Sequence, residues 1–241
     1  MMLKIMAKEQ YVMIEKDEPE FPVRDLVQSK DGNVVFSVFG PNYFSSNVEE
    51  MNKTYSHPKT GEKITFREPT ISESLDLASY DFENFAKPKI FDSRWLQAGR
   101  HVRTQEGVYA NTNETDEKAL TNLLNGAEKV NGIYLINDKI AFVPYDSFKQ
   151  GELEVGEFVE QGLARGLEHT TEKRAEKLAR IGSEKNYSNG VWVGGWDSTN
   201  KPVQRISGLG SSGVGSQLSV DGGSWNDGGD GYAFGVLDKK E

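Results

Sequence analysis

The C-terminal part of the chain has a composition that few folds accept. Large aromatic residues, among them Trp192, Trp196, Trp225 and Tyr232, are spaced through a background of Gly, Ser, Asp and Asn. Residues 207–231 contain no Lys, Arg, Glu, Thr, Pro or His. A flexible linker or tail, which is the alternative reading, would have the small residues without the aromatic ones. The pattern therefore favours a folded sheet, in which aromatic anchors hold a face of small polar residues.

Two strands are expected in this region. Leu218 and Val220 alternate with polar neighbours, which is the period-two pattern of a strand with one apolar side. Residues 232–237 form a second candidate strand. Because a strand turns successive side chains to opposite faces, the polar set could change without touching the apolar set.

The totals exclude several classes of function. The 241 residues include no Cys, which excludes disulfides, thiolate metal sites and cysteine nucleophiles, and the three His have no metal-ligand spacing. A formal net charge of -9 argues against nucleic acid as a partner. Apolar runs are too short to span a bilayer, and the start lacks the apolar region of a signal peptide. We expect no metal, no cofactor and no membrane insertion, with a cytoplasmic location, or association with a cell surface or virion as the alternative.

Upstream, the sequence predicts a mixture of short strands and helices. Residues 33–39 and 64–66 are rich in β-branched and aromatic residues and are expected to be strands. Thr70 and Glu73 fit a capping box, in which each side chain accepts a hydrogen bond from the other residue's backbone amide. This motif predicts a helix over residues 71–85.

Further along, hydrophobic spacing predicts a helix, a hairpin and a longer helical stretch. Residues 116–125 are expected to form a short helix, ended by glycine. The runs 133–136 and 139–143 are joined by Asn-Asp, a pair that suits a tight hairpin. Residues 153–182 have apolar residues at helical spacing, which indicates a core helix with a solvated charged face. Glycines within that stretch are expected to mark a break or a close helix contact.

The small residues of the C-terminal part share a property of the genetic code. Asn, Asp, Ser and Gly are the residues reached when the two adenines of an Asn codon are each kept or changed to guanine. Around these residues stand four segments: residues 190–196 (GVWVGGW), 202–207 (PVQRIS), 223–225 (GSW) and 231–237 (GYAFGVL). They resemble the C-terminal part of the variable proteins made by diversity-generating retroelements, particularly archaeal forms. In that family, errors at adenines diversify the end of the gene.

The resemblance implies a fold and a function. The fold would be α+β, a C-type lectin-like domain of the variable-protein and formylglycine-generating-enzyme-like subtype over residues 71–241, with its variable region at about 190–237. Residues 1–70 would be an N-terminal extension or small subdomain. The function would be ligand binding by a diversified C-terminal surface, without enzymatic activity. The partner would be an unidentified protein or surface ligand, and neither the ligand nor the oligomeric state follows from the sequence.

The same resemblance divides the C-terminal residues into two sets. The scaffold set would be Trp192, Trp196, Arg205, Leu218, Val220, Trp225, Tyr232, Phe234 and Gly235. The variable, ligand-binding set would be the small polar residues Gly208, Gly210, Ser211, Ser212, Gly213, Gly215, Ser216, Ser219, Asp221, Gly223, Asn226, Asp227, Gly228, Gly229 and Asp230. If members of the variable set face solvent, Asp221→Tyr and Asn226→Tyr should leave stability nearly unchanged.

The sequence also bears on four other functions. Trp225-Asn226-Asp227 spells the triplet by which sugar-binding C-type lectins ligate calcium, but calcium needs six to eight oxygens and no partner motif stands upstream. A calcium-dependent carbohydrate lectin is therefore an alternative, as is a structural or tail-like surface protein. Hydrolase chemistry is disfavoured because no nucleophile-elbow motif stands between a strand and a helix. Formylglycine-generating chemistry depends on cysteine, which the chain lacks.

Overall fold

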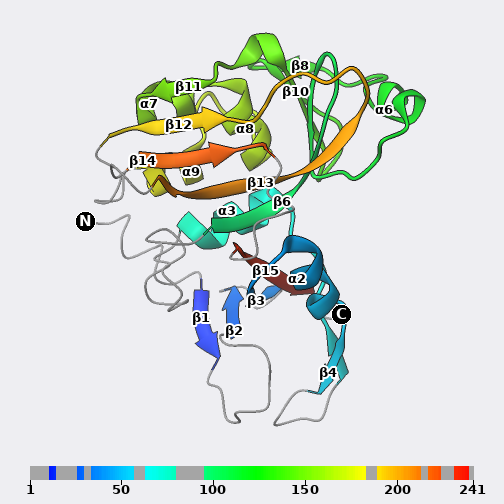
Figure 1. The fold of residues 1–241 in the computed structure, drawn as a ribbon, viewed down its shortest axis with the longest axis vertical. Coiled ribbons are helices and arrows are strands. Elements are labelled where there is room, and N and C mark those ends of the chain that lie inside the picture. The colour runs from blue at the N-terminus through cyan, green and yellow to red at the C-terminus, as the bar shows by residue number, and fades with distance from the viewer. Residues whose placement is uncertain are drawn as a thin grey trace.

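The computed structural model describes residues 11–14, 26–29, 34–56, 63–79, 95–182, 189–212, 217–223 and 231–238. Side chains are not described at residues 11–14, 26–29, 34–38, 41, 56, 211, 212 and 238. The protein is α+β, as expected, with a thirteen-stranded sheet, a two-stranded sheet and six α-helices among the described residues (Figure 1). Within the same ranges, no helix is both long and apolar enough to cross a bilayer.

The large sheet joins both ends of the chain. Its main path contains, in order of pairing, β1 (Tyr11–Ile14), β2 (Leu26–Ser29), β3 (Val34–Asn42), β15 (Gly231–Asp238), β6 (Trp95–Arg103), β13 (Val203–Ser212), β14 (Gln217–Asp221), β12 (Val191–Gly194) and β11 (Gly151–Leu153). A branch continues from β6 through β7 (Gly107–Ala110), β10 (Ala141–Pro144), β9 (Ile133–Leu135) and β8 (Lys129–Val130). β4 (Thr54–Ser56) and β5 (Lys63–Thr65) form the separate two-stranded sheet.

The N-terminal region is built onto the last strand of the chain. β3 pairs antiparallel with β15 from Val34 opposite Asp238 to Asn42 opposite Gly231. The helix α2 (Phe44–Met51) packs nearby, and its Phe44 and Met51 are buried in a small core of their own. Ala233 of β15 belongs to this core as well. The N-terminal region is therefore a subdomain that shares a strand with the rest of the protein.

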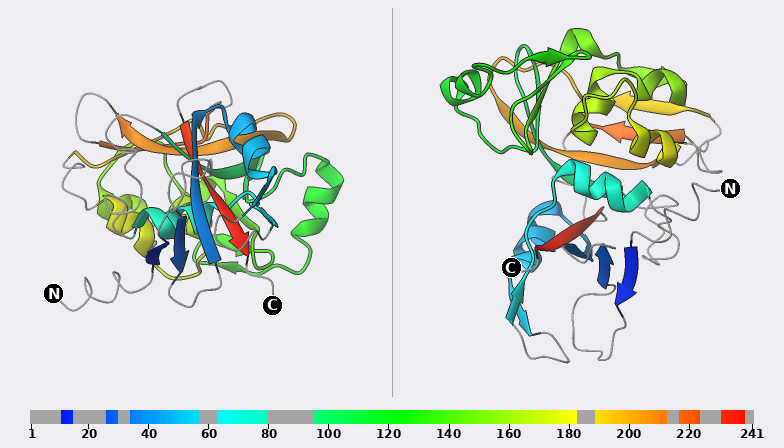
Figure 2. Two further views of the ribbon diagram at one scale, coloured as in Figure 1. Left: turned by 90° about the horizontal axis from the view of Figure 1, so that it is seen from below. Right: turned by 180° about the vertical axis from the view of Figure 1, so that it is seen from behind.

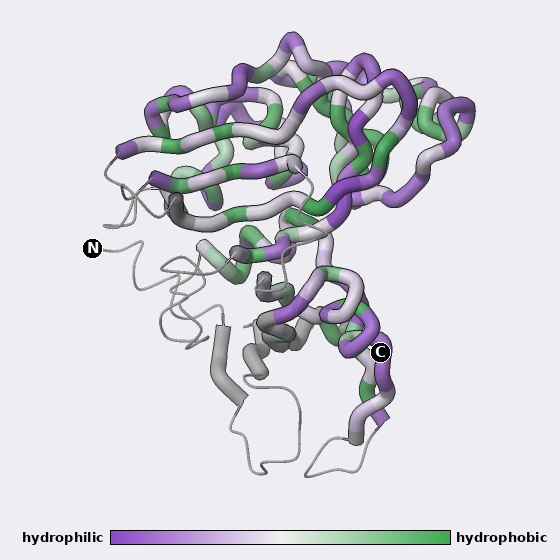
Figure 3. The backbone as a smooth tube through the Cα atoms, viewed as in Figure 1, coloured by the Kyte–Doolittle hydropathy of each residue, from purple (hydrophilic) through white to green (hydrophobic). Residues whose placement is uncertain are grey.

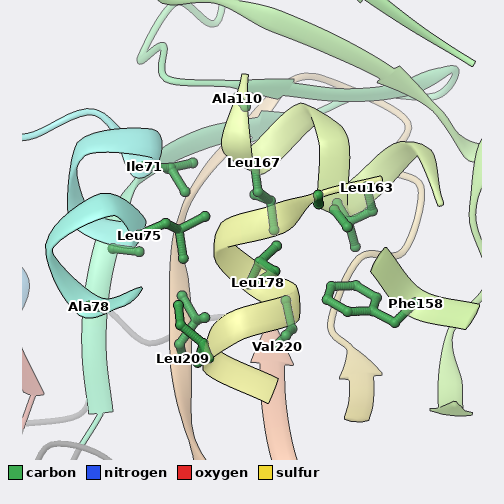
Figure 4. Close-up of a cluster of buried hydrophobic side chains, with 14 of the residues drawn as sticks. Ile71, Leu75, Ala78, Ala110, Phe158, Leu163, Leu167, Leu178, Leu209 and Val220 are labelled. Atoms are coloured by element: carbon green, nitrogen blue, oxygen red, sulfur yellow. The ribbon is translucent and has the colours of Figure 1, made fainter. Parts of the chain in front are cut away.

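Four helices cover one face of the sheet formed by β12, β13 and β14. They are α3 (Ile71–Ser79), α7 (Val155–Val159), α8 (Gly162–Glu168) and α9 (Glu176–Gly182). Seen from behind, α8 and α9 lie in front of these strands (Figure 2). Leu163, Leu167 and Leu178 from these helices pack with Leu209 and Val220 of the strands (Figure 4). Among the described residues, no helix covers the opposite face of the same strands.

The expected helix starts are confirmed. The amide of Glu73 donates to Thr70 Oγ1 at 3.1 Å, and the amide of Thr70 donates to Glu73 Oε2 at 2.7 Å, which is a capping box. Residues 80–85 of the expected helix lie outside the described residues. The second helix, α6 (Glu117–Leu123), is capped by Asp116, whose carboxylate accepts a hydrogen bond from the Ala119 amide at 2.7 Å.

Two expectations about helix length and loop length need correction. The stretch 153–182 is three short helices, α7, α8 and α9, and His169 ends α8 in the left-handed conformation (φ 56). Gly162 and Gly166 are close contacts, as expected: a Cβ on Gly166 would lie 2.1 Å from Val143 Cγ2. The hairpin of β9 and β10 is present, but Leu135 pairs with Ala141, so its loop is longer than the Asn-Asp pair. Asn137 Oδ1 accepts two backbone amides within that loop, from Lys139 and Ile140.

Candidate functional site

The strands β12, β13 and β14 separate two sets of residues. Val191, Val193, Leu209, Leu218 and Val220 are buried in the main core beneath the helices. Because side chains alternate along a strand, the residues between them face the other way. We call this second side of the three strands the outer face; the residues on it that the structure describes are Trp192, Gly194, Gly208, Gly210, Gln217, Ser219 and Asp221. In Figure 1 the outer face is turned toward the viewer, and Figure 3 shows apolar and polar residues alternating along these strands.

Two indole rings lie over glycines of the outer face. A Cβ on Gly194 would lie 2.2 Å from Cη2 of Trp192, and a Cβ on Gly210 would lie 2.8 Å from Cδ2 of Trp95. Ser219 stands between them in the sheet, opposite Trp192 on one side and Gly210 on the other. Both tryptophans are half-buried. The missing side chains are therefore what allows the rings to lie flat along this face.

The expected variable positions fall into three groups. Gly208, Gly210, Ser219 and Asp221 are buried, and Gly223 is half-buried. Ser211 and Ser212 end β13, in register with Leu218 and Gln217, and only their backbone is described. The remaining positions lie outside the described residues: Gly213, Gly215, Ser216, Asn226, Asp227, Gly228, Gly229 and Asp230.

Burial corrects part of the expected display surface. Ser219 is 3% exposed and Asp221 is 8% exposed, so neither offers its side chain freely to a ligand. The side chain of Asp221 is also engaged, since its Oδ1 accepts the Gly223 amide and lies where a Cβ on Gly195 would meet it at 2.5 Å. We therefore expect Asp221→Tyr to destabilise the protein, in place of the tolerance expected from the sequence, because a large ring has no space between these two backbone segments.

The tryptophans expected as buried anchors behave differently from one another. Trp196 is fully buried, and its Nε1 donates to the carbonyl of Val220 at 3.1 Å. A Cβ on Gly222 would lie 2.3 Å from its Cδ2. Trp192, in contrast, lies on the outer face with the small residues rather than beneath them. Trp225 lies outside the described residues. Of the other anchors, Leu218, Val220, Tyr232 and Phe234 are buried as expected, Gly235 is buried, and Arg205 is half-buried.

A cluster of basic residues stands behind the outer face and was missed in the sequence. His101 is fully buried, its Nδ1 lies 2.9 Å from Ser207 Oγ, and its ring centroid lies 4.6 Å from that of Trp196. Burial, with Arg103 and Arg205 adding to its effect, lowers the pKa of His101 to about 3, so the ring is neutral at neutral pH. Burial also lowers the pKa of Arg103, with Arg205 adding to the effect. No local motif joins residues of β6 and β13, so only the register of these strands reveals the cluster.

The described residues contain no candidate metal site, and the chain matches no family model. Within them, no group of three His, Asp or Glu side chains is arranged to hold a metal ion, and the Trp225-Asn226-Asp227 triplet lies outside them. No family model, no curated protein and no solved structure matches this chain. Its function must therefore be argued from the residues and their arrangement.

Proposed function

We propose that the protein is a ligand-binding protein of the diversity-generating retroelement variable type, on a C-type lectin-like scaffold, and that it binds rather than catalyses. The observation that carries the proposal is the segregation along β13 and β14. Gly208, Gly210 and Ser219 share the outer face, while Leu209 and Val220 pack in the main core. Changes to the first set need not disturb the second, which is what a diversified surface requires.

Within the described residues, the proposed binding face is the outer face. Residues 213–216 join β13 to β14, and residues 224–230 join β14 to β15. These segments carry most of the remaining expected variable positions. Trp95 and Trp192 add two partly exposed indole rings to the outer face. Rigid aromatic side chains are the usual anchors of recognition surfaces, so the scaffold itself supplies the aromatic contacts that the small residues lack.

A side-chain hydrogen bond and strand pairing support the proposed scaffold. Trp196 is fixed by its bond to Val220 and by its contact with Gly222. β15 is held between β3 and β6, which brings strands from both ends of the chain together in one sheet. This pairing of strands from the two chain ends supports a C-type lectin-like arrangement.

The proposal is tested first in the DNA. A second copy of the coding segment for residues 190–237 should lie near the gene, differing mainly at adenines, with a reverse transcriptase gene beside it. A complete surrounding genome without such a copy would contradict the retroelement origin.

The protein test compares neighbouring residues of β14. Ser219→Asn, an exchange within the adenine-derived set, should lower the melting temperature by at most about 4 °C, because the outer face can rearrange its indole rings. Leu218→Asn should lower it by about 10 °C or more, because it buries an amide in the main core. Thermal unfolding followed by circular dichroism measures both variants. Equal losses would sink the segregation on which the proposal depends.

A further inference from the structure

Arg103 and Arg205 are neighbours in the sheet, and neither forms an ion pair with a carboxylate among the described residues. Arg103 is 9% exposed and Arg205 is half-buried. The Nε atoms of both are buried and have no hydrogen-bond partner in that part of the chain. A buried arginine is normally paired, because an uncompensated charge away from water is destabilising.

The strand register explains why the two arginines are close. On the antiparallel strands β6 and β13, Arg205 stands opposite His101, and Arg103 stands opposite Val203. Arg103 and Arg205 are therefore diagonal neighbours on one face of the sheet, a relation that sets side chains about 7–8 Å apart at their bases. Long arginine side chains span such a distance easily. Their guanidinium groups can thus converge on one small group.

The existing partners of the arginines are backbone carbonyls. Arg103 Nη1 donates to the carbonyl of Gly195, and Arg205 Nη1 donates to the carbonyl of Gln204 at 2.8 Å. Two carboxylates, Asp197 and Asp221, act on Arg103 through space, but neither forms an ion pair with it. Gln150 Nε2 donates to Asp197 Oδ1 at 3.2 Å, and the Gly223 amide donates to Asp221 Oδ1. Both carboxylates are thus engaged elsewhere.

We propose that Arg103 and Arg205 form a binding site for a small oxyanion. The anion would accept N–H groups from both guanidinium planes and so neutralise two like charges that otherwise repel each other. Arg205 is partly exposed, and so is the neighbouring Thr199, which gives the anion its access. The neutral ring of His101 adds no further charge to the site.

This site is separate from the proposed variable surface. Arg205 lies on β13 before the irregularity in register between Ser207 and Gly208, whereas Gly208 and Gly210 of the outer face lie after it. The oxyanion could be tetrahedral, such as phosphate, or planar, such as a carboxylate. Both offer the oxygen pairs that a guanidinium group binds in a two-pronged manner.

The test is thermal unfolding of the full chain in sodium chloride, sodium phosphate and sodium acetate at equal ionic strength. At about tenfold excess over its dissociation constant, the bound anion should raise the melting temperature of the wild type by about 3–6 °C, and the rise should saturate. A response to phosphate alone or to acetate alone identifies which oxyanion binds, and either supports the site.

Arg205→Gln removes one guanidinium at a half-buried position. In chloride this variant should melt no lower than the wild type, because it relieves the repulsion with Arg103. Its affinity for the anion, measured by titration calorimetry, should fall by at least about tenfold. Arg205→Lys, which keeps the charge but loses the two-pronged geometry, should show an intermediate affinity.

The matched control is Arg174→Gln, the same change at an exposed arginine whose Nε lies 3.6 Å from Glu176 Oε1. It should keep the full, saturable response to the anion. Equal responses in the wild type and in Arg205→Gln would overturn the proposal, since they would show a general salt effect. So would a wild-type response no larger than that in chloride.

Discussion

Asp221 joins three backbone segments through one carboxylate. It ends β14 opposite Gly194 and Gly208, and its Oδ1 accepts the Gly223 amide. Gly195, at φ +74, approaches the same oxygen so closely that only glycine fits there. The turn before Trp196 therefore has room for this carboxylate only because residue 195 has no side chain. Asp221, which the family resemblance would place among the variable positions, is thus part of the scaffold.

Asp221→Tyr should therefore lower the free energy of unfolding by about 1–3 kcal/mol, through overpacking and loss of the hydrogen bond to Gly223. Asp221→Asn keeps an acceptor oxygen of the same size and should lose less than half as much. Urea unfolding of both variants measures the difference. A tyrosine variant as stable as the wild type would return Asp221 to the variable set.

The short helices α8 and α9 are held together by a buried acid. Glu168, 6% exposed at the end of α8, accepts the Leu178 amide of α9. Its backbone carbonyl accepts the Ser72 hydroxyl of α3 at 2.8 Å. Burial raises the pKa of Glu168 to about 7 against the opposing hydrogen bonds and Lys177. The side chain that joins α8 to α9 thus titrates near neutral pH, while the backbone of the same residue holds α3.

The sign of the pH effect follows from this raised pKa. Between about pH 4.5 and 7 the folded protein keeps the Glu168 proton while the unfolded chain has lost it, so the free energy of unfolding falls as pH rises through this range. Glu168→Gln, a permanently neutral side chain, should make the protein more stable than the wild type at pH 7.5, with the difference shrinking toward pH 5. Urea unfolding at both pH values measures it. Glu172→Gln, at an exposed position, is the control and should follow the wild type.

The two cores of the molecule share one strand. β15 places Tyr232, Phe234 and Val236 in the main core and Ala233 in the N-terminal core. On the N-terminal side, a Cβ on Gly235 would lie 2.4 Å from Phe39 Cε2. The N-terminal core and the main core, which lie in separate parts of the molecule in Figure 1, therefore share the strand β15.

Because both cores contain residues of β15, we expect the protein to unfold in a single transition. Phe39→Ala, in the N-terminal core, should destabilise the protein by about 3–5 kcal/mol and shift the whole calorimetric transition, including the part that reports on the main core. Tyr43→Ala, at a side chain 45% exposed, should change it little. Two separate transitions, with only one of them shifted by Phe39→Ala, would show that the cores unfold independently.

Contacts between near neighbours were foreseeable from the residues. The capping box of Thr70 and Glu73, the strand alternation of Leu218 and Val220, and the α+β class all depend on positions a few residues apart. The three-way division of residues 153–182 was not foreseeable, since it depends on how each short helix packs against the sheet.

Contacts between distant strands were decided by the fold alone. His101 and Ser207 meet across 106 residues, and the same register brings Arg103 beside Arg205. Trp192 could be read as an anchor, but which face it takes depends on the pairing of β12 with β14. From the sequence Asp221 is expected to be exchangeable, but in the fold its carboxylate lies close against the turn at Gly195. A one-residue change of register would move every side chain of a strand to the other face, and no local pattern specifies that register between segments so far apart.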